Sequence, residues 1–366
     1  MEKYRHVFER FATFDNMYDG YLKARKHKRQ QDCVLQYTNL LEDNLIDSVN
    51  RLQWHEYHTG QLHQFYEYYP KLRLISSLPF YDRVINCAAH NVLWPIYRKS
   101  MYEYSFGSIE EKGPIRASRT VQQWMRSYAR KPGDWYIVKM DIAKFFFRIP
   151  VDIQLRELSK PLDDPDMVWF LEQAIRCDGR PLGLPVYCTD VTTAERISGI
   201  GMQVGSLISQ MTANVVMTPT DYYIKRELRV PEHARFMDDM MCIVDGKKAA
   251  WEVVGYVDDY LRTNVGLQLN DKTAVIPLGK PVEFVGRKIT PDKIELRRQT
   301  SLGMKKHLRY VREAYGRGDV PLEYALSVIQ SYLGLMQDCN NDALRNQILE
   351  DYVLVRHSQD MLDAAE

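Results

Sequence analysis

The chain has 366 residues, a net charge of +1 and 45% hydrophobic residues, which is enough apolar material for at least one sizeable core. The near-neutral charge excludes a uniformly basic or acidic protein, so any nucleic-acid surface must come from local segregation of charge. We expect neither a secretory signal nor a membrane span, because no basic-then-apolar leader and no run of about 20 apolar residues occurs. The six scattered cysteines lack CxxC spacing and indicate neither a zinc site nor a disulfide framework, which fits a reducing cytoplasm.

The N-terminal 60 residues are predicted to be helical. Apolar residues recur at helical spacing from Phe11 to Leu22, and the five Lys and Arg residues between 23 and 29 follow without an acid. This basic run is interpreted either as a solvated helix end, where positive charge is favourable, or as a contact to a phosphate backbone.

A strand, a turn at Pro79 and a helix are predicted over residues 70–97. The residues expected to face inward on that helix are Val84, Ile85, Ala88, Val92 and Leu93.

The rest of the chain mixes the two element types. We predict a strand at 133–141, helices over 150–177, an irregular stretch at 178–200, and a helix at about 206–228. Two short strands around residues 234–244, a helix at 247–264, a strand at 273–277, a short strand pair at 282–296, and helices to the end complete the pattern, which predicts an α+β fold.

Two pairs of adjacent aspartates compete as a metal site. Asp258 and Asp259 lie within the predicted helix, beside an apolar face, and are interpreted as solvated residues. The members of that face are Trp251, Val254, Val257, Leu261 and Val265.

Asp238 and Asp239 occupy the predicted turn of a β-hairpin in "ARFMDDMMCIV". Alone, such a turn would be merely solvated. Asp141 ends the apolar run Tyr136–Met140, and if that strand lies beside the hairpin, three carboxylates converge. They could then hold two divalent ions for phosphoryl transfer, and Mg²⁺ suits such oxygen ligands.

Six segments in order carry a family resemblance. They are 69–97, "MDIAKFF" (140–146), "GMQVGSLISQ" (201–210), "FMDD" (236–239), "GLQLNDKT" (266–273) and "EFVGRKI" (283–289). Over about residues 10–310 the chain resembles a bacterial or phage reverse transcriptase of the non-long-terminal-repeat type. Phe236 replaces the family's usual Tyr, and Gln203 and Gln210 stand where many relatives have Pro. The pair Ser209–Gln210 at the end of "GMQVGSLISQ", called the Ser-Gln form below, resembles the motif of diversity-generating retroelements and of several unclassified bacterial groups.

The resemblance implies a right-hand polymerase in four parts. These are an N-terminal helical extension (1–60), fingers (61–132), a palm with antiparallel sheet and packed helices (133–281, including the irregular insert 178–200), and a primer-grip hairpin with a helical thumb (282–366).

The resemblance also implies roles for individual residues. Asp141, Ile142, Asp238 and Asp239 would hold two Mg²⁺ ions, with Mn²⁺ as an alternative. Lys272 would act as a catalytic residue at the leaving pyrophosphate, with a structural salt bridge as the other interpretation.

Further residues would contact the substrates. Lys71 and Arg73 would bind the incoming dNTP, unless they are ordinary surface ion pairs. Phe146 would exclude a 2′-hydroxyl, unless it is a core residue, and Gln210 would also line the dNTP site. The template and primer contacts would be Gly201, Gly205, Ser209, Gly286, Lys305, Arg309 and Arg312, whereas the acidic C-terminal segment would face a partner or solvent.

The expected function is an RNA-directed DNA polymerase that extends a DNA, RNA or protein primer with dNTPs. Its partners would be a structured RNA template, the nascent DNA, and an accessory protein or a second copy of the chain, with no membrane. Antiphage defence is the favoured role and a diversity-generating retroelement the alternative. A catalytically inactive RNA-binding protein is the hypothesis from another class.

Overall fold

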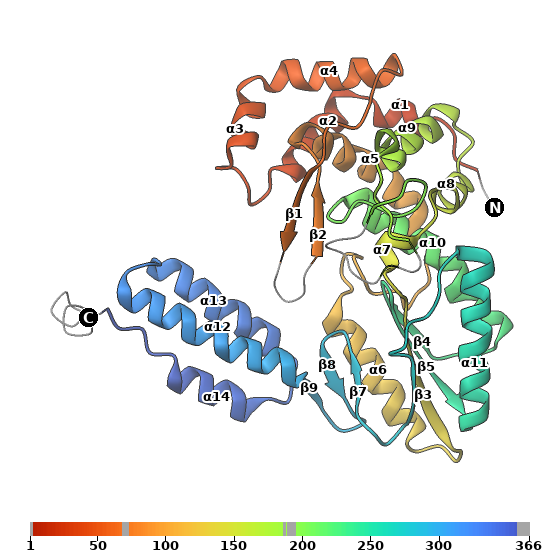
Figure 1. Cartoon of the computed structure of the whole chain (residues 1–366), viewed down its shortest axis with the longest axis vertical. Coiled ribbons are helices and arrows are strands. Elements are labelled where there is room, and N and C mark those ends of the chain that lie inside the picture. The colour runs from red at the N-terminus through yellow and green to blue at the C-terminus, as the bar shows by residue number, and fades with distance from the viewer. Residues whose placement is uncertain (1–2, 68–72, 186–187, 189–194, 357–366) are drawn as a thin grey trace. The chain divides into compact units, whose positions relative to one another are not determined.

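The structure is a computed structural model that describes residues 3–67, 73–185, 188 and 195–356 (Figure 1). Contacts divide the chain into two compact units. Unit 1 comprises Met1–Ser108, Met140–Met240 and Trp251–Thr273, and unit 2 comprises Ile109–Lys139, Met241–Ala250 and Ala274–Glu366. Helices and antiparallel sheets are mixed along the chain, which confirms the predicted α+β fold. No helix in these described ranges has the length and apolar character needed to cross a membrane.

The N-terminal segment is helical, as predicted. It consists of α1 (Val7–Phe11), α2 (Phe14–Ala24), α3 (Asp32–Asn39) and α4 (Leu41–Gln53). Helix α2 buries Met17 and Tyr21 but leaves Phe14 and Tyr18 exposed. A Cβ at Gly20 would lie 2.6 Å from the Val84 carbonyl oxygen, so glycine lets α2 approach α5 (Phe80–Arg98) closely.

Strands β1 (His63–Glu67) and β2 (Arg73–Ser77) form an antiparallel pair that leads into α5. The residues predicted to face inward on α5 are all buried, which confirms the helical periodicity of the sequence. They are Val84, Ile85, Ala88, Val92 and Leu93.

A four-stranded sheet follows the order β4-β5-β3-β6. Its strands are β3 (Trp135–Asp141), β4 (His233–Phe236), β5 (Asp239–Asp245) and β6 (Ala274–Pro277). Strands β4 and β5 are the predicted hairpin around the paired aspartates, and β3 pairs with β6 in antiparallel register. This topology brings Asp141 and the hairpin turn to one end of neighbouring strands.

Six further helices occur between residues 114 and 265 of the described chain. They are α6 (Pro114–Tyr128), α7 (Phe145–Arg148), α8 (Val151–Ser159), α9 (Pro165–Arg176) with the short turn η1 (Cys177–Gly179), α10 (Leu207–Tyr222) continued by η2 (Tyr223–Glu227), and α11 (Lys247–Tyr260) continued by η3 (Leu261–Val265). The described residues between 178 and 200 form no helix longer than η1, as expected for the irregular stretch.

Helix α11 corrects part of the sequence interpretation. Its buried face consists of Ala250, Val253 and Val257 and continues into η3, whereas Trp251 is 48% exposed. Asp258 is not simply solvated, because its carboxylate accepts hydrogen bonds from the Leu269 N–H (2.8 Å) and from Arg262 (2.7 Å). Only Asp259 is exposed as predicted.

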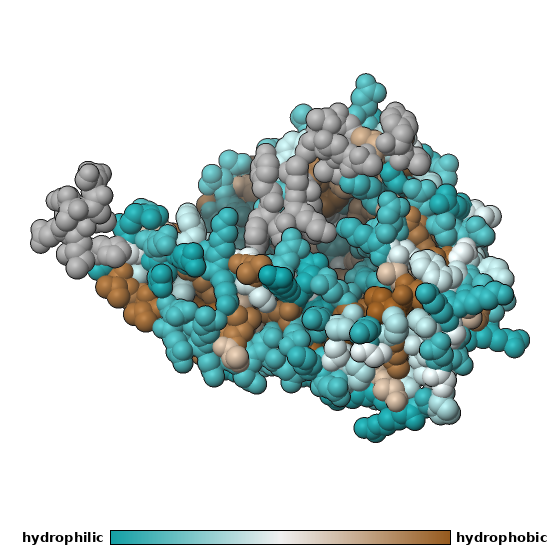
Figure 2. All heavy atoms as spheres, turned by 60° about the horizontal axis from the view of Figure 1, so that its bottom comes forward, coloured by the Kyte–Doolittle hydropathy of each residue, from teal (hydrophilic) through white to brown (hydrophobic). Residues whose placement is uncertain are grey.

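The C-terminal part contains a small sheet and three helices. Strands β7 (Val282–Phe284), β8 (Arg287–Ile289) and β9 (Ile294–Leu296) pair antiparallel, so the predicted strand pair has a third member. Helices α12 (Arg298–Arg317), α13 (Leu322–Met336) and α14 (Asp342–Asp351) follow. Their shared core contains Met304, Leu308, Ile329, Met336 and Ile348. Figure 2 shows apolar side chains between hydrophilic ones on the surface of this helical segment, at the left of the view.

Candidate active site

The two carboxylate-bearing segments lie side by side in unit 1. Asp141 is the last residue of β3, and Asp238 lies in the turn between β4 and β5. The Ile142 N–H donates to the Asp238 carbonyl oxygen at 3.2 Å. The end of β3 is therefore hydrogen-bonded directly to the aspartate turn, which meets the condition that the sequence analysis set for bringing the carboxylates near one another.

A third segment, residues 268–270, holds the end of β3 from its other side. The Ala143 N–H donates to the Gln268 carbonyl at 2.9 Å, and the Asn270 N–H donates to the Asp141 carbonyl at 2.8 Å. The Asn270 side-chain amide donates to Asp141 Oδ2, and its Oδ1 accepts from the Lys272 N–H at 2.9 Å. Asn270 therefore orients the Asp141 carboxylate.

Sequence reasoning missed Asn270. The only signal was its place inside the motif "GLQLNDKT", two residues before the predicted catalytic Lys272. Lys272 is exposed, and within the described ranges no ion pair holds its ammonium group. The salt-bridge interpretation of Lys272 therefore gains no support, and a role at the leaving group stays a prediction.

The oxygen donors fit a hard divalent cation. Asp141, Asp238 and Asp239 are all half-buried, so a solvated ion can reach their carboxylates. Carboxylate oxygens on neighbouring strands are ligands that suit Mg²⁺. In the part of the chain that the structure describes, no three His, Cys, Asp or Glu side chains already stand close enough to hold an ion. The contribution of Asp239 and of the Ile142 backbone to such a site stays a prediction.

The aromatic run after Asp141 is divided between core and surface. Phe145 is 2% exposed, whereas Phe146, in α7, is half-buried and meets the Phe145 ring edge-on at 5.4 Å. The Phe146 carbonyl accepts from the Met202 N–H at 2.7 Å, which ties α7 to the 201–210 segment. Of the two, only Phe146 has a face that could meet a nucleotide.

The structure says less about the other residues that were predicted to bind the dNTP. Gln210 is half-buried in the first turns of α10, next to buried Ser209. Lys71 lies outside the described residues, and Arg73 is the first residue of β2.

The predicted template glycines differ in their surroundings. Gly201 has φ +91°, and a Cβ there would lie 2.9 Å from Gly183, so the packing of the chain itself requires glycine. Gly205 has φ +107°, and a Cβ at this residue would have Ile75 Cγ2 as its nearest neighbour, at 3.8 Å. Gly286, in the turn between β7 and β8, has φ +76° and open space around it. Close approach of a template therefore fits Gly205 and Gly286 better than Gly201.

The three predicted thumb cations line a single hollow of about 390 Å³ between α12 and α14. Lys305 donates to the Gln347 side chain at 2.8 Å, and Arg312 donates to the Asp351 carbonyl at 2.9 Å. Arg309 is exposed on the same face. The three cations therefore share one face of α12, and α14 occupies part of that face.

An antiparallel sheet that presents one aspartate at a strand end and another in the adjacent hairpin turn has the arrangement of a template-directed polymerase palm. A family model described as "Reverse transcriptase (RNA-dependent DNA polymerase)" matches residues 68–289. The chain therefore belongs to the reverse transcriptase family, whose enzyme class is RNA-directed DNA polymerase, a nucleotidyltransferase. Its fold is accordingly that of a right-hand polymerase.

Individual similarities are distant. The chain is 21% identical to protein YkfC of Escherichia coli strain K12 over 252 residues, which cover 60% of this chain and 63% of YkfC. A Candida albicans telomerase in complex with a telomeric RNA fragment is similar over 80% of this chain and 55% of its own, with 13% identity and a TM-score of 0.44. An apo telomerase of Candida tropicalis is similar over 65% and 55%, with 11% identity and a TM-score of 0.45.

Proposed function

We propose that this chain copies RNA into DNA by two-metal-ion nucleotidyl transfer, extending a DNA, RNA or protein primer with dNTPs. The observation that carries the proposal is the hydrogen bond between the Ile142 N–H and the Asp238 carbonyl, which joins the end of β3, where Asp141 lies, to the turn that carries Asp238. Membership of the reverse transcriptase family supports the same reaction.

The residues would divide the work as follows. Asp141 and Asp238, with Asp239 beside them, would hold two divalent cations, and Asn270 would keep the Asp141 carboxylate aimed at them. Those cations would activate the attacking primer hydroxyl and neutralise the leaving pyrophosphate. Lys272, two residues from Asn270, would supply positive charge or a proton to that leaving group.

We further propose a cytoplasmic role in bacterial antiphage defence, with a structured RNA as template. The Ser-Gln form at 209–210 fits this role and a diversity-generating retroelement with an accessory protein equally, and the irregular stretch 178–200 favours defence. Sequencing the nucleic acid that co-purifies with the chain tests it. A repeat shared with a neighbouring variable gene would contradict the defence role.

A primer-extension assay tests the reaction itself. Purified protein with Mg²⁺, dNTPs and primed RNA is expected to incorporate nucleotides. If RNA binds but no primer or template supports incorporation, the chain is an RNA-binding protein with an inactive palm.

The thumb hollow gives a separate prediction. Arg309→Ala is expected to weaken binding of a primed RNA–DNA duplex by about three- to tenfold and to reduce the slope of log K against log salt by about one, because one phosphate contact is lost. Filter binding between about 50 and 200 mM salt measures both quantities.

Arg176→Ala is the matched control for Arg309→Ala. It removes the same charge from α9, where Glu172 already neutralises the guanidinium at 2.7 Å. An unchanged salt slope in Arg309→Ala, or an equal change in both variants, would show that this face makes no phosphate contact.

A further inference from the structure

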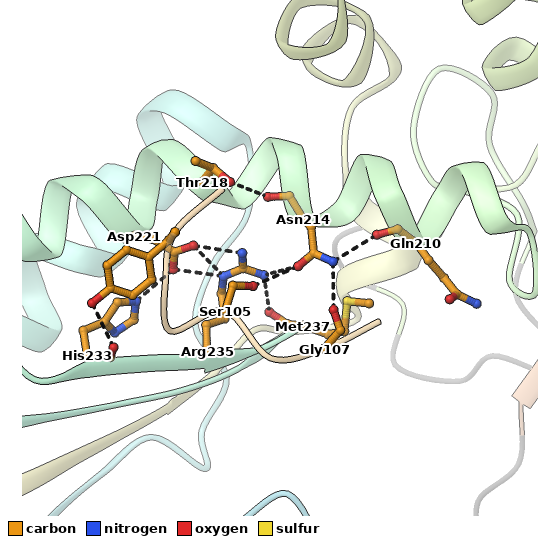
Figure 3. A network of polar contacts seen from close by, with 10 residues as sticks. Ser105, Gly107, Gln210, Asn214, Thr218, Asp221, His233, Arg235 and Met237 are labelled. Carbon is orange, nitrogen blue, oxygen red and sulfur yellow. Dashed lines mark hydrogen bonds and ion pairs between the residues drawn. The ribbon is translucent and has the colours of Figure 1, made fainter. Parts of the chain in front are cut away.

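A fully buried arginine lies two residues before the aspartate turn. Arg235 on β4 is 0% exposed, and its side chain points from the sheet toward α10 (Figure 3). A buried guanidinium is costly unless charge and hydrogen bonds compensate it. The other residues of β4 are apolar or neutral, so a buried charge at this position indicates a specific role for the guanidinium.

One side of the guanidinium is fixed by α10. Arg235 Nε donates to both Asp221 carboxylate oxygens at 2.9 Å, and Nη2 lies 2.8 Å from Oδ2. The buried His233 ring also contacts Asp221, with Nε2 at 2.8 Å from Oδ1. Burial would raise the pKa of Asp221, but Arg235 and His233 together hold that pKa below its ordinary value.

The other side of the guanidinium reaches the turn. Nη1 of Arg235 donates to the Asn214 side-chain oxygen at 3.2 Å and to the Met237 carbonyl at 3.3 Å. Asn214 in turn donates to the Gly107 carbonyl at 2.9 Å. As Figure 3 shows, the guanidinium thus joins α10 to the residue that precedes Asp238, and Asn214 links it to the loop at 105–107.

Met237 needs this support because its backbone is left-handed, with φ +56°. Such a conformation is unfavourable for a residue with a Cβ, and it persists only where the surroundings impose it. Gly107 also packs closely against Met237, since a Cβ at residue 107 would lie 2.8 Å from Met237 Cγ and 2.9 Å from its backbone nitrogen. Met237 is therefore in contact with Gly107 and is hydrogen-bonded by Arg235.

We infer that Arg235 is a positioning residue for the metal-binding turn. Anchored by Asp221 and Asn214, it fixes the Met237 peptide and thereby the direction in which Asp238 presents its carboxylate toward Asp141. A lysine cannot replace it, because one ammonium group cannot pair with Asp221 and also span to the Met237 carbonyl as a planar fork can. This inference rests on the proposed function, and it adds to that function the residue, Arg235, that holds the metal-binding turn in place.

The test measures metal binding without turnover. Mn²⁺ is titrated, with detection by electron paramagnetic resonance, into protein loaded with primed RNA, a dideoxy-terminated primer and the next dNTP. Arg235→Lys is expected to raise the Mn²⁺ dissociation constant at least about tenfold. Duplex binding should change less than about twofold. With an extendable primer, kcat should fall at least about tenfold while the KM for dNTP changes little.

Gly107→Ala provides a second route to the same result. Its added Cβ would crowd Met237 directly, without changing the Arg235 or Asp221 side chain, so it should also weaken Mn²⁺ binding if Arg235→Lys does not fold. Val216→Ala, a buried change on the same helix α10, controls for lost stability. It should lower Tm but leave Mn²⁺ affinity as in the wild type.

The outcomes separate the two proposals. If the wild-type protein binds Mn²⁺ and extends primers, but Arg235→Lys and Gly107→Ala lower only Tm, the network is structural and the positioning inference is overturned. If the wild-type protein neither binds Mn²⁺ nor extends primers, the proposed polymerase function is overturned first.

Discussion

Asp238→Asn is expected to lower primer extension at least about a thousandfold, equivalent to about 4 kcal/mol of transition-state stabilisation. The amide keeps the size of the side chain but removes the negative charge that a divalent cation needs. The backbone contact to Ile142 is unaffected, because it uses the carbonyl of residue 238. RNA affinity and Tm should therefore stay near wild-type values, since neutral substitutions at partly exposed positions usually change stability by less than about 0.5 kcal/mol.

Asp259→Asn is the matched control for this experiment. It makes the same substitution in the other aspartate pair, at an exposed position of α11. Asp258 would be a poor control, because its carboxylate accepts from the Leu269 N–H and so helps to fix the segment 268–270 that contacts Asp141. Single-turnover extension on primed RNA, with filter binding in parallel, gives both readouts. Full activity in Asp238→Asn, or its loss in Asp259→Asn, would reverse the assignment of the two pairs.

Local pattern in the sequence was sufficient to predict the framework of this site. Two short apolar arms around a pair of acids predicted the hairpin, and the apolar run before Asp141 predicted a strand that ends at this residue. Helical periodicity also predicted the buried face of α5. These features depend on the spacing of residues in one segment, so a single sequence is enough to find them.

Contacts between distant segments could not be predicted in the same way. The helical periodicity predicted that Asp258 lies at the edge of an apolar face. It could not predict that the Leu269 N–H, eleven residues later, would donate a hydrogen bond to the Asp258 carboxylate. Likewise, the basic face of α12 was visible in the sequence, but not that α14 would share it. Arg235 was readable only as a charge within a strand, because its partner Asp221 belongs to another element.

Phe146→Ala is expected to reduce the preference for dNTPs over rNTPs by about a hundredfold, the scale on which one added hydroxyl is rejected by a pocket wall. The structure makes Phe146 the suitable ring of the three in sequence. It is half-buried five residues after Asp141, and its backbone is tied to Met202 at 2.7 Å, so its position relative to the 201–210 segment is fixed. Removing the ring opens space for a 2′-hydroxyl without removing a metal ligand.

Phe147→Ala is the control that decides whether sugar selection belongs to Phe146 itself. Phe147 is the next aromatic residue, but its ring is covered by the Arg196 guanidinium at 4.7 Å and is engaged within the chain. Measuring kcat/KM for dCTP and CTP on one primed RNA, in wild type and both variants, separates selectivity from general damage. An altered fold would lower kcat/KM for both nucleotides together. Only a selective increase in kcat/KM for CTP relative to dCTP in Phe146→Ala therefore supports the steric role. Unchanged discrimination would make Phe146 a packing residue of the palm.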